Sequence, residues 1–445
     1  MKLISMISLG CPKNLVDSET ILGILASGGY VVTPSPEDAE IILINTCGFI
    51  EPAVREAVDT IIHCLQLKAK GLCSCVVVLG CLVSRYGEER LSQLLPEVDG
   101  WLGVDAAPFV LQYLERIQAG EKPLFSEHGK PEQYPRMLST PSYTAYLKIA
   151  EGCSHACSFC MIPRIRGPLQ SRTPDEIYRE AEQLAAGGVK ELILVAQDTG
   201  AYGGDLPGKP TLAGILKELV KIDGLRWVRF LYLNPHSLTA ELITTMQEEP
   251  KLCHYLDLPV QHVNRGILKK MGRRGDINFY LELINDLKTA LPDLALRTTL
   301  MVGYPGEDKK AFQELHDFVS LAEFDRLGVF PYYHEQGARS FRYPETVSYI
   351  EKRKRAREIM RLQRKISRRK NQELVGRNLE VLIENSLGKD VWWGRSYRDS
   401  PDIDPRVIVK GRDLNPGTFA QVQVTRAATY DLIGIHTGNR SSRDY

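Results

Sequence analysis

The sequence of 445 residues lacks a long apolar run, an excess of charge of one sign and a low-complexity segment. No apolar run reaches the roughly 20 residues that a membrane-spanning helix needs, so we expect no membrane contact. The 56 Lys and Arg residues balance 55 Asp and Glu residues, and the net charge of +1 provides no global basic field to attract nucleic acid. An apolar share of 43% and a charged share of 25% are ordinary for globular proteins and exclude disordered and collagen-like chains.

Two kinds of short signal are also absent. The first residues, MKLISMISLGCPKN, have one Lys ahead of a short apolar run, without a small-residue cleavage site. They predict a first β-strand rather than a secretion signal, and we expect a cytoplasmic protein. No Walker A or G-x-G-x-x-G segment stands at a strand–helix junction, which leaves binding of a nucleotide phosphate unsupported.

Cysteine, in contrast, is plentiful, with ten residues. Structural disulfides are rare in the reducing cytoplasm. Clustered cysteines in such a chain favour metal binding or catalysis over cross-linking.

Alternating strand-like and helix-like segments predict an α/β protein with three domains. Residues 1–119 predict a parallel α/β domain, and residues 120–138 lie in a proline-rich stretch that is typical of a linker. Residues 139–374 predict six β/α units, which fit a partial (βα)6 TIM-like barrel. Residues 375–442 predict a small all-β barrel.

Short apolar runs mark the expected strands. In the first domain they are Leu3–Leu9, Ile41–Ile44 and Val76–Leu79, with a helix over Pro52–Lys68. The six barrel strands are expected at Ala145–Ile149, Glu191–Val195, Trp227–Leu233, Tyr255–Val260, Leu296–Val302 and Leu327–Tyr332. In the last domain we expect strands at Leu379–Ile383, Val407–Val409, Phe419–Val424 and Asp431–Ile435.

One segment is strongly basic. Glu351–Lys370 holds eleven Lys and Arg residues against two Glu. This pattern is typical of a solvated helix face, and a contact to an acidic partner is the alternative interpretation.

The first cysteine constellation has the spacing C-x3-C-x2-C and comprises Cys153, Cys157 and Cys160, directly after a predicted strand. Three thiolates on one short loop can hold one four-iron–four-sulfur cluster, and a missing fourth ligand leaves one iron open to a small molecule. Zinc is an alternative, with His155 as the fourth ligand, although zinc sites usually use paired cysteines. Cysteines without any ligand are the remaining alternative.

The second constellation consists of Cys11, Cys47 and Cys81, each of which follows an apolar strand run. The ends of parallel strands meet at one edge of an open sheet, so three distant cysteines can converge there. A second three-cysteine cluster with an open iron is the preferred interpretation, and three separate buried cysteines are the alternative. A neighbouring glycine lets the backbone approach a bulky ligand in each case: Gly10, Gly48 and Gly80.

The other four cysteines lack such a pattern, and we expect them to be ordinary packing or surface residues. They are Cys64, Cys73, Cys75 and Cys253.

The C-x3-C-x2-C segment at the end of the first barrel strand resembles the radical S-adenosylmethionine (SAM) superfamily. Both cysteine sets, the six-unit barrel and the terminal β module together resemble the methylthiotransferases over nearly the whole chain. This resemblance implies an N-terminal methylthiotransferase domain, a radical SAM core and a C-terminal TRAM domain with an OB-like barrel. It also implies two 4Fe-4S clusters, and it makes the six cysteines their ligands.

Several motifs resemble the RimO-like branch of that family, which acts on one aspartate of small-subunit ribosomal protein twelve. They are SLGCPKNLVDSE, NTCGFI, YLKIAEGCSHACSFCMIPRIRG and VAQDTGAYG. Pro12-Lys13-Asn14 stands where the MiaB-like, tRNA-modifying branch typically has Gln-Met-Asn. His155-Ala156 is a departure, because relatives often carry basic residues between the first two cysteines.

The resemblance also implies where SAM binds. Phe159 matches an aromatic position of the superfamily and, with Ile162, is expected on the adenine side of SAM. Gln197, Gln261 and Val302 end predicted strands, where polar groups and backbone suit recognition of ribose and carboxylate. Ordinary structural roles are the alternative for all five.

The implied reaction adds a methylthio group to the β-carbon of an aspartate and forms 3-methylthioaspartate. One SAM would donate a methyl group to sulfur at the N-terminal cluster, and another would yield the radical that abstracts hydrogen. The implied partners are ribosomal protein twelve and a low-potential electron donor such as a flavodoxin or ferredoxin.

Methylthiolation of adenosine in tRNA and a non-catalytic electron-transfer module are the alternatives. Residues 375–445 carry ten basic and nine acidic residues, and this near-neutral charge suits a protein loop better than an RNA backbone. Direct RNA contact is therefore compatible with the sequence but not required by it.

Overall fold

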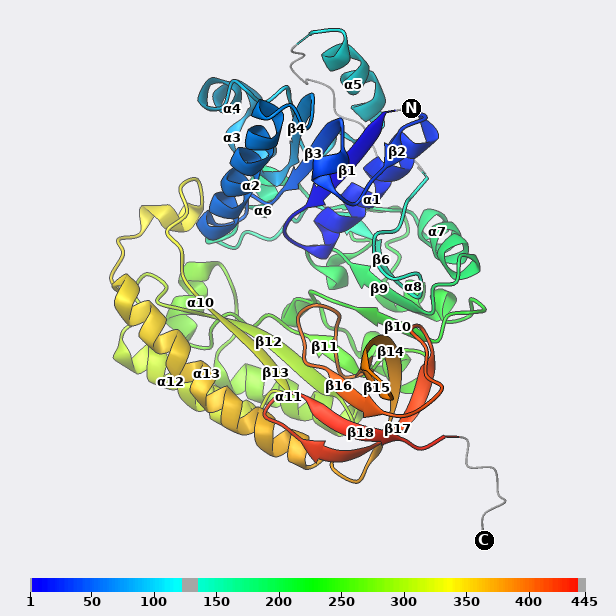
Figure 1. Cartoon of the computed structure of the whole chain (residues 1–445). Helices are drawn as coiled ribbons and strands as arrows, with labels where there is room; N and C mark the ends of the chain where they lie inside the picture. The colour runs from blue at the N-terminus through cyan, green and yellow to red at the C-terminus, as the bar shows by residue number, and fades with distance from the viewer. Residues whose placement is uncertain (1, 122–134, 439–445) are drawn as a thin grey trace.

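The computed structural model describes residues 2–121 and 135–438 (Figure 1). Residues 122–134 of the predicted linker and residues 439–442 of the predicted last domain lie outside the described residues. Figure 1 shows the N-terminal α/β unit above an open barrel, with a small β-barrel beside the latter. The predicted fold class is confirmed.

The N-terminal unit is a five-stranded parallel sheet in the order β2-β1-β3-β4-β5. Its strands are β1 (Leu3–Ser8), β2 (Val31–Val32), β3 (Ile41–Thr46), β4 (Cys75–Gly80) and β5 (Gly100–Leu102). Its helices are α1 (Pro12–Ser27), η1 (Pro36–Asp38), α2 (Glu51–Ala69), α3 (Cys81–Tyr86), α4 (Glu88–Leu94), η2 (Ala107–Phe109) and α5 (Val110–Gln118).

Both faces of this sheet are covered, which is why its central strands read as continuous apolar runs. In β3, Ile41 and Leu43 pack on one side against α1 and α5. Ile42 and Ile44 pack on the other side against α2. The short edge strands β2 and β5 were not expected, because two or three residues leave no periodic signal.

The central unit is an open barrel of two three-stranded parallel sheets, in the orders β10-β9-β6 and β11-β12-β13. A bridge between Val228 and Leu252 links the sheets. Its strands are β6 (Thr144–Lys148), β9 (Glu191–Val195), β10 (Trp227–Phe230), β11 (Tyr255–Asp257), β12 (Ala295–Val302) and β13 (Arg326–Pro331). The six expected strands are thus present.

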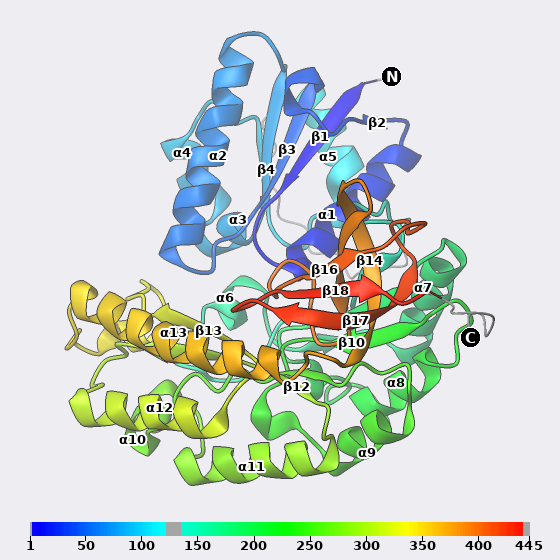
Figure 2. The same ribbon diagram turned by 60° about the horizontal axis from the view of Figure 1, so that its bottom comes forward.

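The helices of this unit lie outside the strands (Figure 2). The main ones are α7 (Pro174–Ala186), α8 (Leu212–Leu219), α9 (Ala240–Glu248), α10 (Arg265–Met271), α11 (Ile277–Ala290), α12 (Lys309–Ala322) and α13 (Tyr349–Gln372). Short elements between them are β7 (Ala150–Glu151), α6 (Ile162–Ile165), β8 (Gln170–Ser171), η3 (Thr199–Ala201), η4 (Pro235–Ser237) and η5 (Arg339–Arg342).

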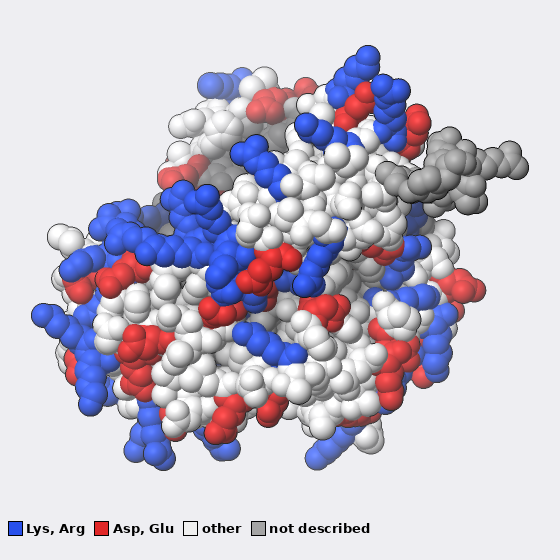
Figure 3. Space-filling view, turned by 90° about the horizontal axis from the view of Figure 1, so that it is seen from below, with Lys and Arg blue, Asp and Glu red and all other residues white. Residues whose placement is uncertain are grey.

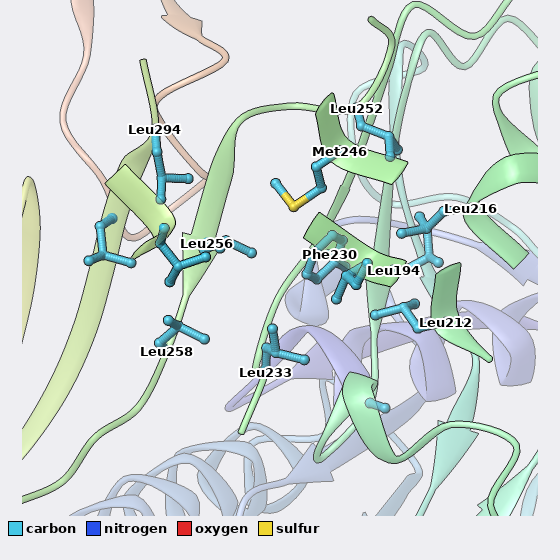
Figure 4. Packing of buried hydrophobic residues seen from close by; sticks show 14 of the residues in the cluster. Leu194, Leu212, Leu216, Phe230, Leu233, Met246, Leu252, Leu256, Leu258 and Leu294 are labelled. Atoms are coloured by element: carbon cyan, nitrogen blue, oxygen red, sulfur yellow. The ribbon is translucent and has the colours of Figure 1, made fainter. Parts of the chain in front are cut away.

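Outward-facing strand residues bind these helices to the barrel. Figure 4 shows Leu194 and Phe230 against Leu212 and Leu216 of α8 and Met246 of α9. Each large apolar side chain buried in this way contributes about 1.5–3 kcal/mol. The outer core therefore holds the strands rigid, so that their ends can carry a site.

The C-terminal unit is a closed barrel in the order β14-β15-β16-β18-β17. Its strands are β14 (Asn378–Gly388), β15 (Val391–Ser396), β16 (Val407–Lys410), β17 (Phe419–Ala427) and β18 (Leu432–His436). The sequence predicted four of the five strands. Strand β15 was missed because its sequence, VWWGRS, does not alternate, and its buried end holds the polar residues Arg395 and Ser396.

The basic segment forms helix α13, and its two faces differ. Lys352 and Arg355 are buried and form ion pairs with Glu345 at 2.5 Å and Glu307 at 2.6 Å. Figure 3 shows Lys and Arg side chains gathered in a band on the left of that view. The exposed basic residues of the helix are Arg353, Lys354, Arg357, Arg361, Arg364, Lys365, Arg368 and Arg369.

Cys64, Cys73, Cys75 and Cys253 are buried in apolar clusters, as expected. Across the described residues, no helix has the length and apolar character that crossing a membrane demands.

Candidate active site

Cys11, Cys47 and Cys81 lie at the same edge of the N-terminal sheet. Cys11 directly precedes α1, Cys47 follows β3 and Cys81 begins α3 after β4. A Cβ atom built on Gly10 would lie 2.8 Å from the Cβ of Cys47 and 3.3 Å from its Sγ. The loops that carry Cys11 and Cys47 are therefore in direct contact.

The charges of these thiols affect one another. Burial, together with the charges of Cys81 and Cys11, raises the pKa of Cys47 to about 11. Burial also raises the pKa of Cys81, while Arg166 opposes that shift. Three buried or partly buried thiols whose charges interact suit a metal group, because metal ligation compensates the cost of desolvated thiolates.

The second set lies on the loop after β7. The Sγ of Cys153 accepts a hydrogen bond from the backbone of His155 at 3.4 Å, and the Sγ of Cys160 accepts one from Ile162 at 3.4 Å. Burial, together with the charges of Cys157 and Cys153, raises the pKa of Cys160 to about 12. The loop thus brings its three thiols together and directs backbone N–H groups at two of them.

This loop does not have the geometry of a zinc site. The Nε2 of His155 lies 2.7 Å from the Oδ2 of Asp198, so the ring is already engaged there. Within residues 2–121 and 135–438, no three His, Cys, Asp or Glu side chains converge on a point where one metal ion would fit. That finding concerns single ions, whereas a four-iron cluster holds its cysteines further apart.

Arg166 connects the two cysteine sets. It follows the second cysteine loop, and its Nε donates a hydrogen bond to the Sγ of Cys81 at 3.3 Å. Its Nη2 donates to the Oδ1 of Asn14 at 2.9 Å, and its Nη1 contacts Glu151 at 2.7 Å and Asp17 at 3.0 Å. The guanidinium is buried and joins residues of both domains.

A second cation completes this network. Lys148, at the end of β6, forms ion pairs with Asp17 of α1 and with Glu151, the latter at 2.8 Å. Burial alone would raise the pKa of Glu151, but Lys148 and Arg166 outweigh burial and hold that pKa well below its usual value. Glu151 is therefore an anion that fixes the positions of both cations.

Apolar and ionic contacts also close the domain boundary. Cys81 packs with Met161 and Ile165, which follow directly on the second cysteine loop. Arg85 of α3 forms a buried ion pair of 2.7 Å with Glu335 of the barrel. The edge of the N-terminal sheet therefore faces the carboxyl ends of the barrel strands, which is where barrel enzymes place their active sites.

A cavity of about 220 Å³ opens at this boundary. The N-terminal domain, the barrel and the C-terminal unit all contribute to its walls. The lining residues are Ser8, Leu9, Gly10, Cys11, Pro12, Leu15, Tyr146, Leu231, Tyr232, Pro401, Asp402 and Ile403.

The five residues predicted to contact SAM lie at different places on the barrel. Gln197 donates a hydrogen bond to Glu151 at 2.6 Å, and its buried Oε1 has no partner among the described residues. Gln261 adopts the left-handed conformation with φ of 70°. Phe159 packs beside an apolar cluster, Ile162 begins α6 and Val302 is fully buried. Their contact with SAM stays a prediction.

Sequence reasoning assigned no role to Arg166, Lys148, Glu151 or Asp17. A charged residue near a cysteine motif looks like a surface residue until its long-range partner is known. The sequence did offer one signal: charged residues, Lys148 and Glu151, stand at the ends of buried strands. Such residues are rarely buried unless they are paired.

Three known families match parts of the chain. Residues 147–319 match the radical SAM superfamily, and residues 375–436 match the TRAM domain. Residues 3–103 match a family described as uncharacterized protein family UPF0004.

Curated relatives match almost the full length. Those from Geobacter sulfurreducens and Pelotomaculum thermopropionicum are each 44% identical, and the alignments cover 97% of this chain and 98% of each relative. A relative from Clostridioides difficile is 43% identical, with the same coverage. All three are named ribosomal protein uS12 methylthiotransferase RimO.

Solved structures share the fold at low identity. The radical SAM methyltransferase TsrM from Kitasatospora setae has a TM-score of 0.55 and 13% identity, over 74% of this chain and 73% of that one. The cobalamin-dependent radical enzyme OxsB has a TM-score of 0.51 and 12% identity, over 81% of this chain and 56% of that one. At such identities the likeness shows the fold alone.

Proposed function

Because this chain belongs to the family of ribosomal protein uS12 methylthiotransferases named RimO, we propose that it attaches a methylthio group to an aspartate of uS12. The acceptor atom is the β-carbon of that aspartate, and the product is 3-methylthioaspartate. The radical SAM match over residues 147–319 supports the reaction class.

The cofactors that fit are two 4Fe-4S clusters and SAM. Cys11, Cys47 and Cys81 would hold one cluster, and the loop of Cys153, Cys157 and Cys160 would hold the other, with SAM beside it. When bound, these groups supply the sulfur, the methyl group and the one-electron chemistry that an unreactive C–H bond requires. The six thiols fit because each set is close together and at least partly buried.

The residues of the chain itself position these groups and keep water away. Arg166 holds the Cys81 thiol toward the barrel through its hydrogen bond of 3.3 Å. The ion pairs of Lys148, Glu151 and Asp17 hold α1 against the end of β6. Closing a site in this way protects reactive species from solvent.

One observation carries the proposal: Arg166, six residues after Cys160, donates hydrogen bonds to Cys81 and Asn14, which supports placing both cysteine sets at one domain boundary. A reaction that joins sulfur from one site to a carbon activated at the other requires this arrangement. Two clusters on opposite sides of the molecule would have suited electron transfer alone.

The remaining parts of the proposal concern partners and organisation. A low-potential donor such as a flavodoxin or ferredoxin would reduce the clusters, and the reaction would occur in the cytoplasm. Contact with RNA is not required by this scheme. The proposed domains, 1–119, 139–374 and 375–442, contain the three family matches.

Mass spectrometry of uS12 tests the proposal. A bacterial strain lacking its resident enzyme should carry unmodified uS12, and expression of this chain should restore the methylthio group on the aspartate. The variant Cys153→Ala/Cys157→Ala/Cys160→Ala should restore none. Unmodified uS12 after expression of active wild-type chain, or restored methylthioadenosine in tRNA instead, would contradict the proposal.

A further inference from the structure

Lys13 is a buried cation without an anionic partner. The residue is only 7% exposed. Within the described residues no carboxylate lies at ion-pair distance from its Nζ, and no oxygen accepts a hydrogen bond from it. The ring of Tyr232 lies against the ammonium group, with its centroid 3.7 Å from the Nζ.

The neighbouring cations show how unusual this is. Arg166 is equally enclosed and Lys148 is partly buried, and both form ion pairs with Glu151 and Asp17. A cation–π contact contributes about 0.5–2 kcal/mol, whereas a buried charge without a partner costs several kcal/mol. The ring of Tyr232 therefore orients the ammonium group but does not neutralise it.

The other charged groups near Lys13 form no ion pair with it within the described residues. These groups are Cys11, Arg166, Glu151 and Asp257. The Oδ2 of Asp257 accepts a hydrogen bond from the backbone of Tyr232 at 3.2 Å, and its Oδ1 faces Arg297 at 3.5 Å. Glu151 is occupied by two other cations.

Lys13 also lies next to residues that line the cavity at the domain boundary. It follows Cys11 and Pro12, and both of these residues line the cavity of about 220 Å³ together with Tyr232. Tyr232 adopts a left-handed backbone conformation with φ of 62°, a strained state that is typical of functional sites. The cavity and the unpartnered ammonium group therefore adjoin the cysteine edge at which the proposed sulfur transfer occurs.

We propose that the ammonium group of Lys13 binds the side-chain carboxylate of the target aspartate. This inference rests on the proposed function, in which the β-carbon of that aspartate receives the methylthio group. The carboxyl carbon is bonded directly to the β-carbon, so an anchored carboxylate fixes the reacting carbon within one bond. Lys13 thereby selects aspartate over asparagine, whose neutral amide leaves the buried charge uncompensated.

Binding of two uS12 loop peptides to the cluster-loaded enzyme tests the inference. One peptide carries the target aspartate and the other carries asparagine at that position. Wild-type enzyme should bind the aspartate peptide roughly 10- to 100-fold more tightly, as expected for a charge-assisted contact. Lys13→Met should bind both peptides with similar, weak affinity, and Lys13→Arg should recover part of the preference.

Controls separate this role from others. Lys70→Met, an exposed substitution in the same domain, should behave as wild type. Lys13→Met should retain the full iron content and the wild-type KM for SAM in cleavage without peptide. Loss of iron, or a raised KM for SAM, would overturn the inference in favour of a counter-ion to the cluster or to SAM.

Failure of the inference about Lys13 can be told apart from failure of the proposed function. If wild-type enzyme does not modify the aspartate peptide, the proposed function fails. If wild-type enzyme modifies it and Lys13→Met still prefers aspartate by the wild-type ratio, only the role of Lys13 fails.

Discussion

Arg166 shows how much of this site depends on single long-range contacts. Its guanidinium touches Cys81, Asn14 and Asp17 of the N-terminal domain and Glu151 of the barrel. Arginine suits this position because its planar fork presents donors in several fixed directions at once. The residue therefore acts as a joint between two domains.

We predict that Arg166→Met destabilises the protein by about 3–5 kcal/mol, because Glu151 and Asp17 then share one cation inside the protein. Thermal and denaturant unfolding of the cluster-free proteins measures this effect. Arg164→Met is the matched control, since Arg164 lies on α6 two residues before Arg166, is exposed and donates a hydrogen bond to the carbonyl of Gly337. Equal stability of the two variants would mean that the contacts of Arg166 contribute nothing to the free energy of unfolding.

At the residue scale, sequence reasoning identified the cysteines but not the residues that hold them. Cysteine spacing is a local signal, and C-x3-C-x2-C is visible within eight residues. The bond from Arg166 to Asn14 joins positions that are 152 residues apart. No pattern in either segment predicts it, because the pairing arises only when the two domains meet.

At the scale of elements, the site depends on strand-to-helix turns. Gly10 stands between β1 and α1 with φ of 94°, a conformation that residues with a side chain rarely adopt. Its missing side chain also lets the chain pass beside Cys47. The turn thus sets the distance between two thiols of the first set.

We predict that Gly10→Ala lowers the iron content of reconstituted enzyme from about eight to about four atoms per chain, because only the N-terminal cluster is disturbed. Iron and sulfide analysis after anaerobic reconstitution measures this. Gly29→Ala is the control, because Gly29 has a similar φ of 87° but a Cβ atom at that position would meet no other atom within 4 Å. A full iron complement in Gly10→Ala would refute the proposed ligand set.

Strands with a long apolar run were predicted from the sequence, whereas very short edge strands were not. Strand β9 has the expected bounds, Glu191–Val195, since the four apolar residues after Glu191 form a clear run. The edge strand β2 has only two residues, and it exists because the neighbouring strand β1 offers free backbone groups. Tertiary pairing, rather than local preference, creates such elements.

At the scale of the whole molecule, paired charges join the C-terminal unit to the barrel. Arg395 of β15 forms an ion pair of 2.5 Å with Glu191 at the start of β9, and Arg229 contacts the same carboxylate at 2.8 Å. Burial alone would raise the pKa of Glu191, but Arg395 and Arg229 lower it to about 2 from 4.5. The charged form of Glu191 therefore stabilises the assembled protein.

This shift predicts an acid-sensitive contribution of about 3 kcal/mol. A lowered pKa in the folded state means that the contribution is complete above pH 4.5 and is lost as the pH falls toward 2. Glu191→Gln should therefore differ from wild type most at neutral pH, and the difference should shrink in that acidic window. Unfolding of cluster-free protein between about pH 2 and pH 7 checks this, with the exposed Glu248→Gln as control. A difference that is constant with pH would contradict the assignment.

The loop between β15 and β16 gives Pro401, Asp402 and Ile403 to the wall of the cavity, although the unit from which it comes contains no cysteine. Part of the cavity wall and the two cysteine sets thus come from different units of the polypeptide. Exchanging this loop between related enzymes would reshape the entrance for a new acceptor while leaving both thiol sets untouched. Substitutions in this loop, natural or engineered, could therefore change which acceptor enters the cavity while the cysteine sites stay as they are.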